Sequence, residues 1–165
     1  MLFGSNSQES LKKLRAGDTK ADVQRDTGVT VGAFDVNFSV AQGEIFVVIG
    51  LSGSGKSTVL RCLNLLHKPT EGAVFYKESD ITKFTKEELL EYRRNNIAMV
   101  FQNFGLMSHR SVLGNVVYGL EVRGLPKEAR EKKALEMIQM VGLAGWENRN
   151  IHALSGGMRQ RVGLA

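Results

Sequence analysis

Gly50-Leu-Ser-Gly-Ser-Gly-Lys-Ser57 is the most informative stretch of this 165-residue sequence. It matches the pattern G-x-x-x-x-G-K-[ST], and it stands between an apolar run at 44–49 and a segment with helical spacing of apolar residues from Val59 onward. Glycines let successive backbone N–H groups turn toward one side, and the N-terminus of the following helix adds partial positive charge. The stretch therefore predicts a phosphate-binding loop between a buried strand and a helix.

The polar residues of this loop have separate expected roles. Lys56 is expected to reach the β- and γ-phosphates of a nucleoside triphosphate, and the hydroxyl of Ser57 is expected to ligate Mg²⁺. The amides around Thr58 are expected to hold the inner phosphates. The residues expected to line the phosphate site are Gly50, Ser52, Gly53, Ser54, Gly55, Lys56, Ser57 and Thr58. Such a loop leaves GTPases, kinases and motor ATPases open, and a simple glycine-rich turn is the structural alternative.

Three stretches with apolar residues predict the strands of a sheet. Residues 34–40 alternate apolar and polar side chains, which is the period of a half-buried strand, and Gln42-Gly43 follows as a turn. Residues 44–49 are apolar on both faces, as is typical of a central strand covered by helices on both sides. Residues 97–101 predict a second buried strand that ends at Gln102. This pattern indicates an α/β protein.

Capping signals delimit the expected helices. Thr85-Lys-Glu-Glu88 is a capping box, and it predicts a charged helix reaching about Arg94. Pro126 can occupy the first turn of a long helix that Gly142 terminates. The apolar stripe of that helix, which we expect to pack in the core, consists of Ala129, Ala134, Leu135 and Ile138. Residues 5–30 are polar with only a weak helical stripe, which predicts a mobile or accessory segment.

Leu154-Ser-Gly-Gly157 is a second candidate anion site. Ser155 can cap a helix that begins there, and a hydroxyl with two glycines at a helix N-terminus repeats the chemistry of the first loop. An ordinary helix start is the structural alternative. Because the two sites lie far apart in the sequence, we expect the second to serve a different nucleotide from the first.

Composition and charge exclude several classes of protein. With 42% hydrophobic and 24% charged residues the chain is typical of soluble globular proteins, and its longest apolar run, Ile45–Ile49, is too short to cross a bilayer. The N-terminus lacks the basic and apolar regions of a signal peptide, and the single Cys62 cannot form an internal disulfide, so the cytoplasm is the expected compartment. The net charge is +5, but charges alternate in sign along the expected helices, so we expect no nucleic-acid partner. His67, His109 and His152 have no partners at metal-ligand spacing and are expected to be structural or on the surface.

Taken together, these motifs resemble those of the ATPase subunits of ABC transporters, over nearly all of residues 31–165. The resemblance implies a P-loop NTPase core with a parallel sheet and a helical subdomain, in which Gly50–Thr58 is the Walker A motif and Leu154–Met158 the signature. It also implies that Gln102 is the Q-loop glutamine, which contacts Mg²⁺ and the attacking water and faces the membrane subunit. Lys56 and Gln102 are then the catalytic residues of this chain, and Ser57 and Gln102 the metal ligands.

Within that family the sequence is similar to the importer branch for glycine betaine, proline betaine and related quaternary amines. Met158, where most members carry Gln, fits this branch, and so does the polar insertion between Phe3-Gly4 and Val31. By the same resemblance Phe3 matches the aromatic residue that stacks on adenine, with a terminal hydrophobic residue of no function as the alternative. The resemblance implies a polar N-terminal segment at 1–30, a RecA-like part at 31–84, a Q-loop and helical subdomain at 85–153, and a signature helix at 154–165.

The resemblance also implies partners and a location. Two ATPase subunits pack head to tail, so that ATP lies between the Walker A motif of one and Leu154, Ser155, Gly156 and Gly157 of the other, and ATP closes a two-fold dimer. Closing and reopening pull on two membrane permease subunits, which take up a solute delivered by an extracytoplasmic binding protein. The subunit would therefore be peripheral, on the cytoplasmic face of the membrane.

The sequence departs from the family pattern in several respects. No run of four apolar residues followed by Asp-Glu, the Walker B pattern, occurs in it, and no switch histidine follows the signature. We therefore expect the chain to be a fragment that binds Mg-ATP weakly and hydrolyses it negligibly. The alternatives are a soluble ABC ATPase acting on DNA repair or the ribosome, and a remnant that binds without function.

Overall fold

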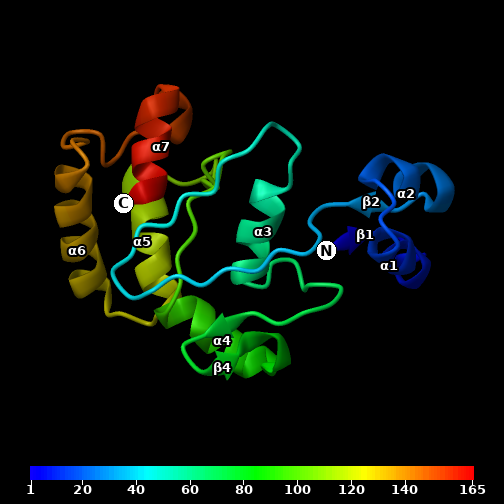
Figure 1. Ribbon diagram of the computed structural model, residues 1–165. Coiled ribbons are helices and arrows are strands. Elements are labelled where there is room, and N and C mark those ends of the chain that lie inside the picture. The colour runs from blue at the N-terminus through cyan, green and yellow to red at the C-terminus, as the bar shows by residue number, and fades with distance from the viewer. The chain divides into compact units, whose positions relative to one another are not determined.

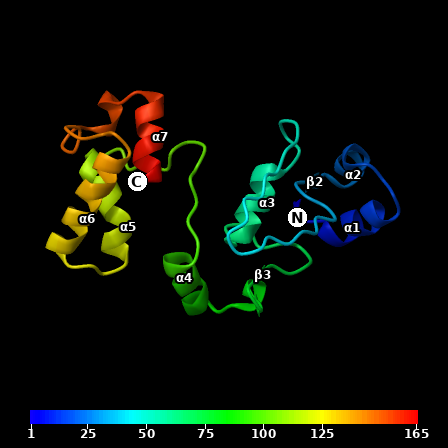
Figure 2. The same cartoon turned by 60° about the vertical axis from the view of Figure 1, so that its left-hand side comes forward.

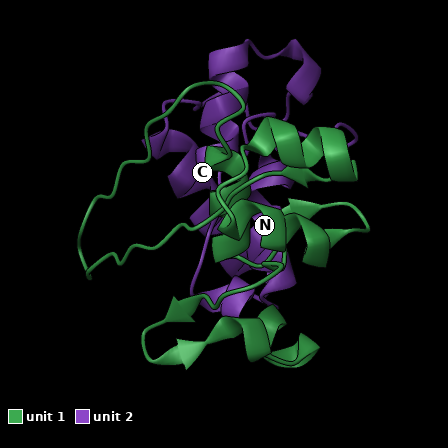
Figure 3. Cartoon of the chain, turned by 45° about the vertical axis from the view of Figure 1, so that its right-hand side comes forward, with its two compact units in different colours: residues 1–90 green, residues 91–165 purple.

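The computed structural model describes all residues from Met1 to Ala165. The chain forms two compact units, residues 1–90 (unit 1) and residues 91–165 (unit 2), shown in different colours in Figure 3. The boundary falls within one helix, α4 (Lys86–Asn95). Each unit has its own buried residues and is described by itself.

Unit 1 begins with a helical hairpin joined to a two-stranded sheet, drawn in blue in Figure 1. Strand β1 (Leu2–Phe3) pairs antiparallel with β2 (Thr30–Val31), and helices α1 (Ser7–Arg15) and α2 (Lys20–Thr27) lie between them in the sequence. The side chain of Thr19 caps α2, and Gly28 ends it with φ 70, in the left-handed region that glycine adopts without strain. We call residues 1–31 the N-terminal hairpin.

The N-terminal hairpin has a hydrophobic core of its own. The buried members of this core are Leu2, Leu11, Leu14, Val23, Val29 and Val31. The buried Ser10 hydroxyl donates to the carbonyl oxygen of Asn6 at 2.8 Å and lies 2.9 Å from the hydroxyl oxygen of Thr27, so the polar group is satisfied. The polar segment predicted at 5–30 is therefore a folded accessory element.

The rest of unit 1 holds helix α3 and a second hairpin. Helix α3 (Lys56–Leu63) follows the glycine loop, and strands β3 (Phe75–Tyr76) and β4 (Ser79–Asp80) pair antiparallel before the short 3₁₀ helix η1 (Ile81–Lys83). The predicted capping box opens α4: the Thr85 amide donates to Glu88 Oε2 at 2.7 Å, and the Glu88 amide donates to Thr85 Oγ1 at 3.2 Å. The capping-box prediction is confirmed.

The strands predicted at 34–40, 44–49 and 97–101 do not form in this structure. Its sheets are only β1–β2 and β3–β4, and the side chains of Ile45 and Ile49 are 90% and 89% exposed. The physical reason is that a central strand needs a neighbour hydrogen-bonded along its length, and no other segment of the chain takes that position. The predicted turn at Gln42-Gly43 does form, with Gly43 at φ 80, and it lets the Phe38 and Phe46 rings stack with centroids 4.8 Å apart.

Unit 2 is a helical bundle, seen on the left of Figure 2. Helix α5 (Val112–Val122) packs on α6 (Lys127–Met140) and on α7 (Gly156–Leu164), with the 3₁₀ helix η2 (Ile151–Ala153) before α7. The buried core comprises Val112, Val116, Val117, Ala134, Ile138, Leu143, Ile151, Leu154 and Val162.

The prediction that one apolar stripe of α6 packs in the core is confirmed for two of its four residues and wrong for the other two. Ala134 and Ile138 are buried, but Ala129 and Leu135 are exposed. Ala134 and Ile138 are one helical turn apart and so lie on one face, while Leu135 is turned about 100° from Ala134. Gly142 ends the helix with φ 68, as the sequence predicts. No helix of the structure is long and apolar enough to span a lipid bilayer.

Candidate nucleotide-binding site

The start of α3 is open to an anion. Gly55 is its N-cap residue, with φ 101, and no side chain caps this helix. Hydroxyl groups of Thr19, Ser111 and Ser155, by contrast, cap α2, α5 and α7. The first backbone amides of any helix have no partner within the helix, so those of α3 are available to a phosphate group.

The glycines of the loop are required by space as well as by conformation. Gly53 and Gly55 have φ 79 and 101, in the left-handed region. A Cβ added at Gly50 would lie 2.7 Å from Ser54 Oγ, and one added at Gly55 would meet the carbonyl oxygen of Gly32. A loop this tight brings bare backbone to the concave side, which fits the close approach of phosphate oxygens.

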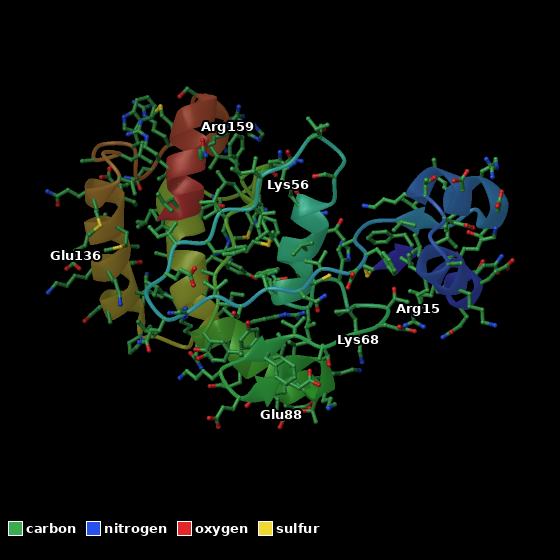
Figure 4. The ribbon with its side chains drawn as sticks, in the orientation of Figure 1. Arg15, Lys56, Lys68, Glu88, Glu136 and Arg159 are labelled. Carbon is green, nitrogen blue, oxygen red and sulfur yellow. The ribbon has the colours of Figure 1, made fainter.

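Lys56 is turned back over this loop. Its Nζ atom donates to the carbonyl oxygens of Gly50 and Leu51, both at 2.7 Å, and its side chain is half-buried at the beginning of α3 (Figure 4). An ammonium group has three donors, and a phosphate accepts them more strongly than a neutral carbonyl does because the bond is charge-assisted. The predicted phosphate ligand is therefore held at the loop itself.

Ser57 and Thr58 occupy the first turn of α3, as predicted. Ser57 is exposed and offers a hydroxyl oxygen, the hard type of donor that Mg²⁺ takes together with phosphate oxygens and waters. Thr58 is half-buried, and its Cγ2 atom lies 3.0 Å from the position that a Cβ on Gly32 would take. Further along the helix, burial raises the pKa of the Cys62 thiol.

Phe3 lies in the same unit as the glycine loop. Its ring is 37% exposed and meets the His67 ring edge-on, with centroids 5.4 Å apart at 84°. The start of the chain is held by a hydrogen bond, which the Met1 amino group donates to the carbonyl oxygen of Ala33 at 2.5 Å. Burial lowers the pKa of that amino group. Neither Gly32 nor His67 was singled out in the sequence as part of the site, although a glycine directly after Val31 was a possible signal.

Gln102 belongs to unit 2. It is exposed in a turn, and the neighbouring Phe104 has φ 64 and lies under the Arg159 guanidinium, 5.6 Å from the ring centroid. The carbonyl oxygen of Phe104 also lies 3.0 Å from the position of a Cβ on Gly163. The turn that carries Gln102 therefore packs beside α7.

The sequence predicts a second anion site at the start of α7. Leu154 is buried at the helix start, and Ser155 Oγ accepts a hydrogen bond from the Met158 amide at 3.3 Å. Gly156 and Gly157 are exposed, with no atom within 4 Å of an added Cβ. The predicted cap is thus confirmed, and the two glycines leave room for another molecule at the helix start.

The structure therefore distributes the predicted site residues over both units. The phosphate loop from Gly50 to Thr58, together with Phe3, belongs to unit 1. Gln102 and the stretch from Leu154 to Gly157 belong to unit 2. There Arg159 of α7 lies over the ring of Phe104, close to Gln102 in the chain.

Comparison with known proteins assigns these motifs to a family. The family model described as ABC transporter matches residues 33–165. The chain belongs to the ABC transporter family. The ABC ATPase fold predicted from the sequence is confirmed by solved structures: a dimeric bacterial ABC transporter cassette matches 85% of this chain and 62% of its own, with a TM-score of 0.78 and 35% identity. A second cassette structure, of a post-hydrolysis state bound to ADP and Pi, matches 82% of this chain and 60% of its own, with a TM-score of 0.77 and 36% identity.

Similar curated proteins of this ABC family serve the transport of small quaternary amines and an amine oxide. The glycine betaine/carnitine transport ATP-binding protein of Listeria monocytogenes is 49% identical over 99% of this chain and 41% of its own length. The glycine betaine transport ATP-binding protein of Bacillus subtilis is 48% identical over 99% of this chain and 39% of its own. The trimethylamine N-oxide transport ATP-binding protein of Ruegeria pomeroyi is 46% identical over 99% of this chain and 48% of its own. The chain thus spans less than half the length of these relatives.

Proposed function

We propose that this chain is part of the ATP-binding, energy-coupling subunit of an ABC importer for quaternary ammonium osmolytes such as glycine betaine and proline betaine. One observation carries the proposal: relatives named for glycine betaine transport match 164 residues of this chain at 46–49% identity. A methionine import ATP-binding protein of Francisella tularensis matches only 131 residues, 79% of the chain. The longer match to the glycine betaine relatives supports the quaternary-amine branch.

ATP and Mg²⁺ are the proposed ligands. The open start of α3, the left-handed glycines and the Lys56 ammonium support binding of the triphosphate at Gly50–Thr58. Ser57 would ligate Mg²⁺ from this loop, with Gln102 as a second ligand that also orients the attacking water. Phe3, which is partly exposed, would stack on adenine.

A head-to-tail dimer is the proposed assembly. Each chain would place its Walker A loop against the signature of the other chain, which consists of Leu154, Ser155, Gly156 and Gly157. The exposed Gly156 and Gly157 at the start of α7 support this proposal, because the first amides of a helix have no partner within it and no side chain crowds these two glycines, whereas the Met158 amide is bonded to Ser155 Oγ. A dimeric solved cassette of the family at 35% identity supports it further.

The proposed partners lie at the membrane. Two permease subunits would bind the ATPase dimer, partly through the surface around Gln102, and an extracytoplasmic binding protein would deliver the solute to them. The subunit would be peripheral, on the cytoplasmic face. In this proposal residues 31–84 form the RecA-like part, 85–153 the Q-loop and helical subdomain, and 154–165 the signature helix.

Solute uptake tests the proposal. Cells that express the full-length subunit containing this chain, together with permease subunits and a binding protein, would accumulate radiolabelled glycine betaine at high osmolarity. The Lys56→Ala variant would abolish this uptake, while Lys132→Ala, at an exposed position on α6, would leave it unchanged. Uptake that is equal in the Lys56→Ala variant and the wild type would refute the proposed role.

A further inference from the structure

Phe3 is held in place by the N-terminal hairpin. Leu2 pairs with Val31, and Phe3 pairs with Thr30, so the strand that carries the ring is fixed to the strand that ends the hairpin. Leu2, Val23 and Val31 are buried in one core, and Val23 has no exposed surface. The backbone position of Phe3 therefore depends on the packing of α1 and α2 (Figure 1).

The same hairpin is attached to the rest of unit 1. The Leu2 amide donates to Thr70 Oγ1 at 2.9 Å, and Arg15 on α1 forms an ion pair with Glu71 at 2.5 Å. Thr70 and Glu71 lie in the segment between α3 and β3. These contacts join the hairpin to the segment after α3 as well as to the chain after β2.

Gly32 is the point where the Phe3 ring and the start of α3 meet. A Cβ added at Gly32 would lie 2.7 Å from Phe3 Cε2 and 3.0 Å from Thr58 Cγ2. No real Cβ tolerates the first of these distances, so the ring and the Thr58 methyl group both lie against the bare Cα of Gly32. The Phe3 ring also lies at 84° to the His67 ring, with the two centroids 5.4 Å apart.

We propose that the N-terminal hairpin is a positioning element that fixes the Phe3 ring against Gly32, beside Thr58 and the phosphate loop, and thereby sets how much the base contributes to the affinity of the site for a nucleotide. This inference rests on the proposed function, in which Phe3 stacks on adenine. The hairpin residues act through Phe3 and contact no nucleotide themselves. Affinity for the phosphates, which the α3 start and Lys56 provide, does not depend on the hairpin.

Binding of two probes to the full 165-residue chain tests this inference. NMR titrations with Mg-ATP and with Mg-tripolyphosphate, which has no base, give a dissociation constant for each. Phe3→Ala is expected to weaken ATP binding about tenfold, because stacking on an aromatic ring contributes on this order. Val23→Ala, which opens a cavity in the hairpin core, and Thr70→Val, which removes the acceptor of the Leu2 amide, are expected to weaken ATP binding several-fold. All three are expected to leave tripolyphosphate binding unchanged. Phe3→Tyr keeps an aromatic ring and is expected to bind ATP about as tightly as the wild type.

A matched control and a second measurement keep the test independent of nucleotide affinity. Val122→Ala makes the same change on an exposed face of α5 and is expected to alter neither constant. In the free chain, nuclear Overhauser effects between the Gly32 Hα protons and the Phe3 ring are expected in the wild type and in Val122→Ala, and they are expected to weaken in Val23→Ala.

The outcomes separate the two proposals. A wild type that binds neither probe would contradict the proposed function, while the Overhauser comparison would still decide the positioning role. Equal weakening of both probes by Val23→Ala, or Overhauser effects unchanged in Val23→Ala, would overturn the positioning role.

Discussion

The Nζ atom of Lys56 donates a hydrogen bond of 2.7 Å to the carbonyl oxygen of Gly50, six residues earlier in the chain. The same ammonium donates to the carbonyl oxygen of Leu51, so the positive charge lies over the loop that it follows. A triphosphate bound at the loop would replace these neutral acceptors with charged oxygens, which form the stronger hydrogen bonds. The lysine is thus positioned by the loop before the ligand arrives.

Lys56→Ala is expected to abolish measurable binding of ATP to the chain. The variant removes the charge-assisted bonds and leaves the glycine loop and α3 in place, so the helix content measured by circular dichroism is expected to stay unchanged. Isothermal titration calorimetry with Mg-ATP measures the loss. Lys132→Ala is the control, and equal affinities of wild type and Lys56→Ala would contradict the role of this lysine.

Gly55→Ala is expected to destabilise unit 1 by about 2 kcal/mol or more. An alanine at φ 101 is strained, and its Cβ would meet the carbonyl oxygen of Gly32. Gly119→Ala is the control, because an added Cβ there has no atom within 4 Å and lies in a helix, where alanine is favoured. Urea unfolding followed by the NMR signals of the unit that carries each substitution measures the difference. A Gly55→Ala chain as stable as the wild type would show that the loop is not as tight as described.

Ile138→Ala and Leu135→Ala test which face of α6 packs in the core of unit 2. Ile138 is 1% exposed, and its truncation is expected to cost about 2–5 kcal/mol, the usual range for buried aliphatic side chains. Leu135 is 44% exposed, and its truncation is expected to cost no more than about 1 kcal/mol. Thermal unfolding of the two variants provides the comparison. A larger loss for Leu135→Ala would restore the stripe expected from the sequence.

Acid is expected to destabilise the N-terminal hairpin through Asp26. The hydrogen bond from Lys13, at 2.8 Å, and then that from Arg25 hold the pKa of this carboxyl below its usual 3.8. Because the folded pKa is the lower one, the stabilisation is complete above pH 3.8 or so and is lost as the pH falls through the folded value. Urea unfolding followed by the Val23 and Val29 signals is therefore expected to show a larger loss between pH 5 and about pH 2 in the wild type than in Asp26→Asn. Identical pH dependence of the two chains would exclude this contribution.

Local signals in the sequence predicted local structure well. The capping box at Thr85–Glu88, the Ser155 cap and the glycine at 142 each depend on neighbours within a few residues, and all three are found in the structure. The glycine loop follows its own sequence pattern in the same way, although the contact of Gly55 with the carbonyl oxygen of Gly32 lies outside the motif. The two caps form through hydrogen bonds between residues only three positions apart, and a pattern in the sequence can therefore predict them.

Features that depend on distant partners could not be predicted in the same way. The apolar run at 44–49 is typical of a central strand, yet a strand forms only where another segment pairs with it, and none does here. The N-terminal hairpin is polar in composition, and its few apolar residues form a core only because β1 and β2 bring the ends together. The contact of Phe3 with Gly32 and His67 joins residues more than 25 positions apart, and no spacing in the sequence indicates it.

The shared nucleotide site between two chains is tested most directly by mixing two defective variants. Lys56→Ala chains keep the start of α7 but lose the phosphate ligand. Ser155→Arg chains keep the phosphate loop, but the bulky side chain blocks the approach of a second chain's nucleotide; they are expected to bind ATP as monomers. Gln139→Arg, at an exposed position on α6, is the charge-matched control and is expected to associate like the wild type.

Sedimentation velocity at high protein concentration with Mg-ATP is the deciding measurement. Each defective variant alone is expected to remain monomeric, and the mixture is expected to form dimers, because a mixed pair holds one intact site made of Gly50–Thr58 from one chain and Leu154–Gly157 from the other. If the mixture stays monomeric while the wild type dimerises, or if either variant dimerises alone as the wild type does, the shared site would be contradicted.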